Sequence, residues 1–286
     1  MAELARDLKA RDLVDLSPRP TRARQLRYWS ALWPQLLALM AAVAVWQLVA
    51  WSGWRPASQL PGPWPVFHRL FNDLTSVNFY VGVAITLLRA VIGYGIAVVA
   101  GTATGLLVAR VTFLRRALGS ALLGFRSMPS ISWFPLATLL FQRSETAIIL
   151  VVLLGAAPAI ANGLLSGVDH VEPLLVRVGR VMGARGVGLY RHVILPAALP
   201  SFVGGLKQGW AFAWRSLMAG ELILRAFAGQ QRSLGQQLRS AQDLSDIQQL
   251  IALMIVIFII GVLVDTGFGV LDREIRRRWG LVGVEA

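Results

Sequence analysis

Residues 248–270 read QQLIALMIVIFIIGVLVDTGFGV, a stretch in which Asp265 is the single charged side chain. An α-helix needs about 20 predominantly apolar residues to cross the hydrocarbon core of a bilayer. This stretch has that length, and it is apolar on every side of the predicted helix. A helix of this kind has to be buried in a large core or in a membrane. The stretch is therefore typical of a transmembrane helix.

Further apolar stretches of similar length precede this one, at about 32–51, 80–109, 117–140, 146–165 and 201–224. The composition agrees, because 56% of the residues are hydrophobic and only 15% are charged. In hydrocarbon, backbone N–H and C=O groups have to be paired within the chain, and an α-helix pairs them by itself. The sequence therefore predicts an all-α, polytopic membrane protein with six transmembrane helices.

The basic residues indicate how these helices are oriented. The net charge of +13 could suggest a nucleic-acid partner, but the basic residues lie mainly between the apolar stretches, so we expect a bilayer and no nucleic acid. With the N-terminus inside, 18 basic residues fall in cytoplasmic segments and six in external ones. This asymmetry predicts two cytoplasmic termini, in tails 1–30 and 273–286, around a transmembrane domain of residues 31–272. We expect the first stretch to be retained as an anchor, because it is too long for a cleaved signal.

Several kinds of catalytic site are excluded by the residues that the chain lacks. It contains no cysteine, which excludes thiolate nucleophiles and cysteine metal sites. A P-loop needs a Gly-Lys pair, but Lys9 and Lys207 both follow leucine. The three histidines are far apart in the sequence, at His68, His170 and His192. We therefore expect a protein that is not an enzyme and that binds no metal or cofactor.

The longest connection, residues 166–200, lies on the predicted cytoplasmic side. It predicts two short helices, of which the second covers residues 187–193 and ends before Pro196. We expect Leu189 and Tyr190 to be exposed there, which water alone would not favour, so the projection predicts a protein partner. The first helix carries an apolar stripe made of Leu174, Leu175, Val178, Val181 and Met182.

A family resemblance rests on this connection. The run Gly183-Ala184-x5-Tyr190-x2-Val193-x-Leu195-Pro196-x3-Pro200 resembles the EAA loop of type I ATP-binding-cassette importer permeases, although Arg177-Val178-Gly179 stands where Glu-Ala-Ala would stand. Other motifs agree, namely Leu60-Pro61-x-Pro63, Thr86-Leu87-x-Arg89, Arg126-x2-Pro129-x3-Trp133-x-Pro135-Leu136 and Glu221. Together they resemble the nitrate, sulfonate, taurine and bicarbonate branch, most closely the aliphatic sulfonate permeases, over nearly the whole chain after residue 30.

The resemblance implies a function and a set of partners. It implies a bacterial inner-membrane permease that imports a small oxyanion or organic anion, with a sulfonate ahead of nitrate, taurine or bicarbonate. A homodimer would bind cytoplasmic ATPase subunits, which hold ATP and Mg, and an extracytoplasmic solute-binding protein. Transport would follow alternating access. The coupling loop between helices 4 and 5 would contact the ATPase through Gly183, Ala184, Leu189, Tyr190, Val193, Leu195 and Pro196.

Charged residues inside the apolar stretches are candidates for the substrate pathway, because a charge at the bilayer centre is costly. Arg126 is followed within ten residues by three serines and two prolines, which indicates either an anion pathway or a cation paired for packing. Arg89 lies too deep to reach the interface, so we expect it to pair with Glu221 or Asp265. The pathway candidates are Arg126, Ser127, Ser130, Arg89, Arg215 and Glu221.

An alternative function is an autonomous anion channel or secondary carrier that works without an ATPase. In that case Arg89, Arg126 and Arg215 would line a pore. The long cytoplasmic connection would then have no purpose, and the hydropathy pattern shows no evident inverted repeat. Both observations favour the permease.

Overall fold

The structure is a computed structural model, and it describes residues 21–111, 113–117, 124, 128–142, 145–224 and 232–278, with side chains described from residue 33 onward. Within these ranges the ordered elements are helices and no strand occurs, so the predicted all-α class is confirmed. The chain divides into two compact units, residues 1–65 and 66–286.

The first unit consists mainly of α2, Thr21–Trp51. Its segment Trp33–Trp51 is apolar and long enough to cross a membrane. The connection after α2 folds back on the helix, because the Trp46 indole N–H donates a hydrogen bond to the Pro61 carbonyl at 3.1 Å. The proline-rich connection then leads into α3, Pro63–Leu74.

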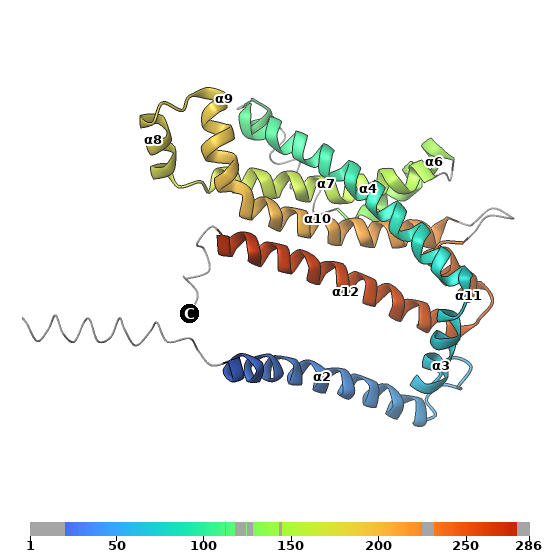
Figure 1. The fold of residues 1–286 in the computed structure, drawn as a ribbon. Helices are drawn as coiled ribbons and strands as arrows, with labels where there is room; N and C mark the ends of the chain where they lie inside the picture. The colour runs from blue at the N-terminus through green and yellow to red at the C-terminus, as the bar shows by residue number, and fades with distance from the viewer. Residues whose placement is uncertain are drawn as a thin grey trace, which may run out of the picture. The chain divides into compact units, whose positions relative to one another are not determined.

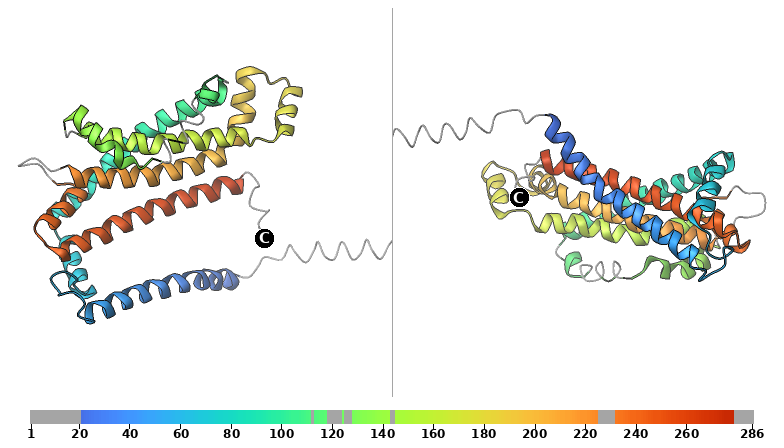
Figure 2. Two further views of the ribbon diagram at one scale, coloured as in Figure 1. Left: turned by 180° about the vertical axis from the view of Figure 1, so that it is seen from behind. Right: turned by 90° about the horizontal axis from the view of Figure 1, so that it is seen from below.

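The second unit is built around α4, Val77–Arg110, α7, Glu145–Asp169, and α10, Leu195–Ile223. Small residues let these helices approach closely. A Cβ atom at Gly163 of α7 would lie 2.4 Å from the Cα atom of Gly205 of α10, a distance that no real side chain tolerates. Helices in membranes commonly pack through such small residues. The fourth long helix, α12, Ile247–Arg278, lies beside α10 (Figures 1 and 2).

The short helices of the second unit gather at its two ends (Figure 1). α8, Pro173–Val181, and α9, Gly186–Leu189, lie at one end. α6, Phe134–Phe141, and α11, Leu234–Asp243, lie at the opposite end. The 3₁₀ turn Ser130–Trp133 leads into α6. The long helices therefore join two ends of the second unit, each of which carries short helices.

At the end that carries α11, an ionic cluster joins α3 to the start of α12. Arg69 Nη2 lies 3.4 Å from a carboxylate oxygen of Asp246, and Arg69 Nε lies 3.6 Å from one of Asp73. Burial raises the pKa of the Asp73 carboxyl, although the neighbouring Arg69 acts in the opposite direction. Within the second unit the cluster thus fixes α3 to the residue before α12, through charges that water reaches only partly.

Four of the predicted transmembrane stretches form helices that are apolar and long enough to span a bilayer, namely Trp33–Trp51, Val77–Arg110, Glu145–Asp169 and Ile247–Arg278. The stretch 201–224 lies within α10, which is long enough but carries Lys207, Arg215 and Glu221. The stretch 117–140 is only partly described, and its described part consists of the 3₁₀ turn and α6. The chain is thus a multi-helix membrane protein with four apolar spans in its described part.

The prediction that the second cytoplasmic helix ends before Pro196 is wrong. α9 continues through a π-helical turn, Tyr190–Ile194, directly into α10. Pro196 directly follows the π-helical turn, where the α-helical hydrogen-bond ladder is already interrupted, so its missing backbone N–H is tolerated within a continuous helix. The connection and α10 therefore form one continuous helical rod.

Candidate functional site

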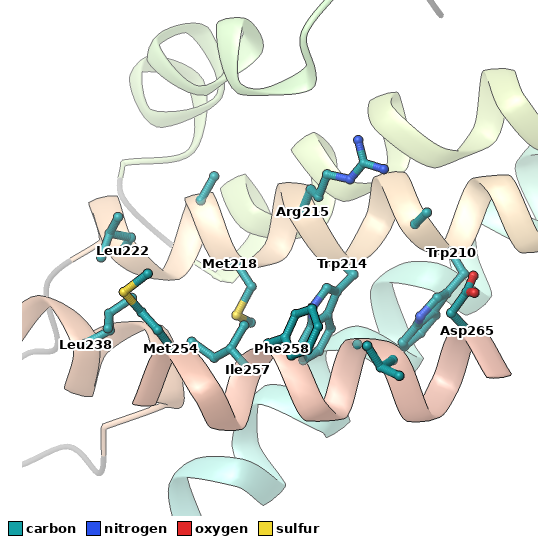
Figure 3. A pocket seen from close by; sticks show the side chains of 14 residues that line it. Trp210, Trp214, Arg215, Met218, Leu222, Leu238, Met254, Ile257, Phe258 and Asp265 are labelled. Carbon is teal, nitrogen blue, oxygen red and sulfur yellow. The ribbon is translucent and has the colours of Figure 1, made fainter. Parts of the chain in front are cut away.

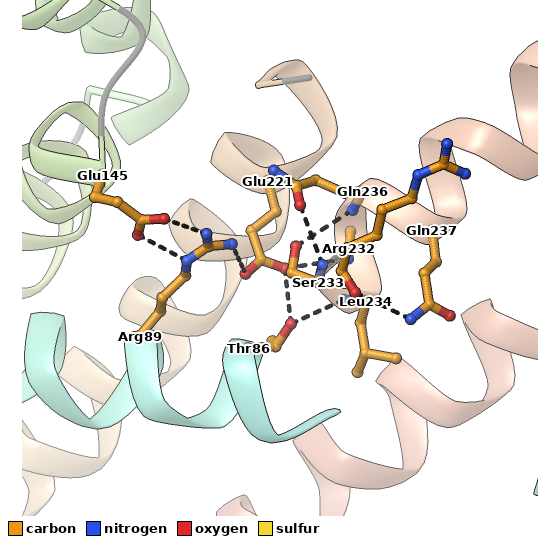
Figure 4. Close-up of polar contacts among 10 residues, drawn as sticks. Thr86, Arg89, Glu145, Glu221, Arg232, Ser233, Leu234, Gln236 and Gln237 are labelled. Atoms are coloured by element: carbon orange, nitrogen blue, oxygen red, sulfur yellow. Dashed lines mark hydrogen bonds and ion pairs between the residues drawn. The ribbon is translucent and has the colours of Figure 1, made fainter. Parts of the chain in front are cut away.

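Glu221, near the end of α10, is the centre of the most extensive buried polar cluster in the described part of the chain. Its side chain is 0% exposed. Thr86 Oγ1 donates to Oε2 at 2.9 Å, the Gly235 backbone N–H donates to Oε2 at 3.1 Å, and Arg89 Nη1 donates to Oε1 at 3.0 Å (Figure 4). A buried carboxylate is stable only when it is paired with a cation and its remaining lone pairs accept hydrogen bonds. Side chains from α4 and the backbone of α11 meet this requirement.

Arg89 links this cluster to α7. Its Nε atom donates to Glu145 Oε2 at 2.8 Å, and its Nη2 atom donates to Glu145 Oε1. The predicted pair with Glu221 is therefore confirmed, and the alternative pair with Asp265 is wrong, because Asp265 lies 3.3 Å from the Lys207 amine instead. Sequence reasoning missed Glu145. Its place at the start of an apolar stretch, on the same predicted side as Arg89, was the available signal.

The same cluster fixes the start of α11. The first N–H groups of a helix have no partner within the helix. In α11 the Leu234 N–H donates to Thr86 Oγ1 at 3.0 Å, and the Gly235 N–H donates to Glu221. Ser233 and Gln236 complete a capping box at this terminus. α11 is thus capped by side chains of α4 and α10, which holds it across the end of the core.

Of the predicted pathway residues Arg126, Ser127 and Ser130, only Ser130 is described, since the other two lie outside the described residues. Ser130 Oγ lies 2.6 Å from Ser216 Oγ of α10. Gly155 of α7 allows this approach, because a Cβ atom there would lie 2.7 Å from Ser216 Oγ. The 3₁₀ turn is thus fixed to the seam between α7 and α10 by a pair of hydroxyl groups.

A groove of about 700 Å³ runs between α10 and α12 and is mostly apolar (Figure 3). Met218, Met254 and Phe258 contribute to its walls. Trp214 also lines it and stacks on Trp210, with ring centroids 6.1 Å apart.

The predicted pathway residue Arg215 lies at the rim of this groove. Its side chain points away from α12 (Figure 3), and its guanidinium carbon lies 5.6 Å from the centroid of the Phe212 ring. Arg215 is exposed, and it has no carboxylate partner among the described residues. The structure therefore separates Arg215 from the cluster that contains Arg89 and Glu221.

At the end that carries α8, the residues that form the exposed apolar surface differ from those predicted. Leu189 is only 7% exposed, and Tyr190 is partly buried, with its hydroxyl donating to the Ala109 carbonyl at 3.4 Å. Both were expected to be exposed, so that prediction is wrong. The reason is that α9 and the π-helical turn pack against α8, where a Cβ atom at Gly179 would lie 3.1 Å from Leu189 Cδ1 and 2.8 Å from Val193 Cγ2.

The stripe on α8 is the exposed apolar surface instead. Val181 is 89% exposed and Met182 is 81% exposed. The other exposed members are Leu174, Leu175 and Val178. We call these five residues the α8 stripe. Such a contiguous apolar surface is typical of a protein interface.

Glycine shapes the turn between α8 and α9. Gly183 has a φ angle of +88°, in the left-handed region that L side chains rarely adopt. The Ala184 N–H donates to the Gly179 carbonyl at 3.0 Å, which closes the end of α8. Leu195 and Pro196 lie beyond the π-helical turn, in the first turn of α10. The structure thus has a glycine turn at the predicted elbow, with the other predicted coupling residues on the rod that follows it.

Comparisons with known proteins agree with this architecture. A family model described as "Binding-protein-dependent transport system inner membrane component" matches residues 93–277. The putative aliphatic sulfonates transport permease protein of Escherichia coli is 29% identical over 231 residues, which cover 81% of this chain and 86% of that protein. The taurine transport system permease protein of Escherichia coli is 28% identical over 242 residues, 83% of this chain and 86% of that protein. The nitrate import permease protein of Synechocystis sp. is 26% identical over 238 residues, 80% and 84% of the two chains.

A solved structure shares the fold. A chain of the MetNI methionine ABC transporter, in inward facing conformations, matches with a TM-score of 0.58 and 20% identity. The match covers 69% of this chain and 96% of that chain. This chain therefore shares the fold of that transporter chain. The resemblance to sulfonate, taurine and nitrate permeases, predicted from the sequence, is confirmed by the family model and the relatives.

Proposed function

This chain belongs to the family of binding-protein-dependent transport system inner membrane components, and we propose that it is the permease subunit of an ATP-driven importer that prefers sulfonate-type anions. Two copies with six spans each and cytoplasmic termini would form the pathway. A solute-binding protein would deliver the anion from outside. ATP and Mg would be bound by the ATPase partner, so this chain itself would be a translocation subunit rather than an enzyme.

The observation that carries this proposal is the exposed α8 stripe. It lies at one end of the second unit, beside a turn that Gly183 keeps in a left-handed conformation. The apolar side chains Val181 and Met182 would be unfavourable in water, and a partner that covers them would gain their burial. An ATPase subunit is the partner that an importer permease requires. A channel or carrier without an ATPase would not need this surface.

The continuous rod supports alternating access. α9, the π-helical turn and α10 connect the α8 end to Glu221 at the opposite end without a break. A displacement of the α8 end would therefore be carried along α10 by a rigid element. Transporters use such rigid-body movements to expose a site first to one side and then to the other.

The preference for sulfonates is supported by the names of the relatives and by the charges of this chain. The relatives are named for aliphatic sulfonates, taurine and nitrate, each of which carries an oxyanion group. Arg89 and Arg215 carry the positive charge that suits an anion, and Arg215 has no carboxylate partner among the described residues. Taurine is itself a sulfonate, which places sulfonates ahead of nitrate.

Co-expression of the chain with its ATPase subunit tests the docking proposal. Val181→Asp and Met182→Asp place charges on the α8 stripe and should abolish both co-purification of the ATPase and sulfonate uptake. Leu244→Asp is the matched control, since Leu244 is 76% exposed at the opposite end of the second unit. It should leave co-purification unchanged. Full ATPase recovery and uptake with both stripe variants would contradict the proposal. Anion flux in vesicles that lack the ATPase would favour the channel instead.

A further inference from the structure

Arg89 holds two carboxylates that differ greatly in exposure. The side chain of Glu221 is 0% exposed, whereas that of Glu145 is 62% exposed. Glu221 cannot leave Arg89 without stranding a buried charge. Glu145 can leave at a smaller cost, because water reaches its carboxylate and Arg89 keeps Glu221 as its partner. Only the Glu145 carboxylate is therefore an exchangeable ligand of Arg89.

The edge of the guanidinium that faces Glu145 is suited to an oxyanion. Arg89 Nε and Nη2 donate side by side to the two oxygens of Glu145, while Nη1 on the other side donates to Glu221 (Figure 4). Two parallel donors in one plane match two oxygens of a carboxylate, sulfonate or nitrate group. The Glu145 carboxylate thus occupies the position that such a group would take.

The Arg89 guanidinium is also held in a fixed position, which improves its fit to an oxyanion. Its Nη1 atom is anchored on a wholly buried carboxylate, which is itself held by Thr86 and by the backbone of α11. The exposed edge of Arg89 is therefore pre-organised, so an anion that binds there does not have to order the side chain. A surface arginine lacks this advantage.

We propose that the Nε and Nη2 edge of Arg89 binds the transported oxyanion, and that Glu145 is an internal anion which the substrate displaces and which returns when the substrate leaves. The identity of the anion as a sulfonate rests on the proposed function. Exchange of one monoanion for another leaves the charge around Arg89 unchanged. A tethered competitor acts at an effective concentration of the order of millimolar, so the site releases its anion readily. Release of this kind is what a transport site requires.

Cysteine labelling tests the proposal, because the chain has no native cysteine. Glu145→Cys frees the edge of Arg89 and places a thiol beside it. In the full-length chain, purified in neutral detergent, an anionic sulfonatoethyl methanethiosulfonate should react faster than its cationic trimethylammonioethyl counterpart. We expect this preference to exceed that of a control by about tenfold. The matched control is Asp243→Cys, since Asp243 pairs with Arg239, an arginine on the same helix that is 38% exposed.

Competition supplies a second readout. Sodium methanesulfonate or sodium nitrate, added at constant ionic strength, should slow the labelling of Glu145→Cys and leave that of Asp243→Cys unchanged. The preference should disappear when Arg89→Gln and Glu221→Gln are added to Glu145→Cys, because this pair of changes removes the cation without stranding its buried partner.

Three results would overturn the proposal. The first is an equal preference for the anionic reagent at the two cysteine positions. The second is that neither free anion slows the labelling of Glu145→Cys. The third is that phosphatidylglycerol nanodiscs slow this labelling while the free anions do not. The last result would assign Arg89 to a lipid headgroup. Since no transport is measured and no ATPase is present, each of these failures would leave the permease function standing.

Discussion

Replacement of Arg89 by glutamine should destabilise the protein more than replacement of either carboxylate that it binds. Arg89→Gln leaves Glu221, which is 0% exposed, without a cation, and stranding a buried charge costs about 3–5 kcal/mol. Glu221→Gln should cost less, about 1.5–3 kcal/mol, because it removes charge-assisted hydrogen bonds while Arg89 keeps Glu145. Glu145→Gln should cost at most about 1 kcal/mol, since its side chain is 62% exposed.

The order of these three values tests the reasoning more sharply than any single value. Unfolding of the purified chain by a denaturing detergent, followed by circular dichroism, would give the free energies. The double variant Arg89→Gln/Glu221→Gln should be more stable than Arg89→Gln alone, because it removes the stranded carboxylate. If Glu221→Gln proves as damaging as Arg89→Gln, or if the double variant recovers nothing, the assignment of a buried, ionised Glu221 is refuted.

Three further predictions concern topology, packing and pH. In intact cells an impermeant maleimide should label a cysteine at position 232 but reach one at position 185 only after lysis, and the reverse pattern would contradict the predicted orientation. Gly163→Ala should lower the free energy of unfolding by about 1–3 kcal/mol through overpacking. Gly204→Ala should not lower it, because nothing lies within 4 Å of the added Cβ atom. Equal losses in the two variants would contradict the close-packing argument. Burial raises the pKa of Asp73, so its contribution to stability is fully present below the ordinary pKa of about 3.9 and is lost as the pH rises through the raised value. Asp73→Asn should flatten this part of the curve of melting temperature against pH. An unchanged curve would contradict the assignment.

The long helices could be predicted from the sequence because a run of apolar residues carries its own signal. Residues 248–270 need no partner to be identified as a helix in a membrane, and the structure places them in α12. The pair between Arg89 and Glu221 was predictable for a related reason. A charge deep in an apolar helix has to find an opposite charge, and few carboxylates lay within reach.

Features that depend on contacts between distant segments could not be predicted in this way. The exposure of Leu189 was misjudged because the burial of that side chain depends on how α9 packs against Gly179 of α8. Periodicity shows which residues share a helix face, but it does not show which face meets a neighbour. Glu145 was missed for the same reason, because its contact with Arg89 requires α4 and α7 to lie side by side.

Glycine packing also bears on where movement in this permease can occur. A Cβ atom at Gly101 of α4 would lie 2.7 Å from the Ala157 carbonyl oxygen of α7, and one at Gly163 of α7 would lie 2.4 Å from Gly205 of α10. Contacts this close leave no room for one helix to slide past another, since packed interiors do not deform continuously. α4, α7 and α10 should therefore move as one body when the α8 end is displaced. The Arg89 and Glu221 cluster holds the same three helices, so it would travel with that body, and the surfaces free to separate during transport are those outside it, including the face that carries the exposed Arg215.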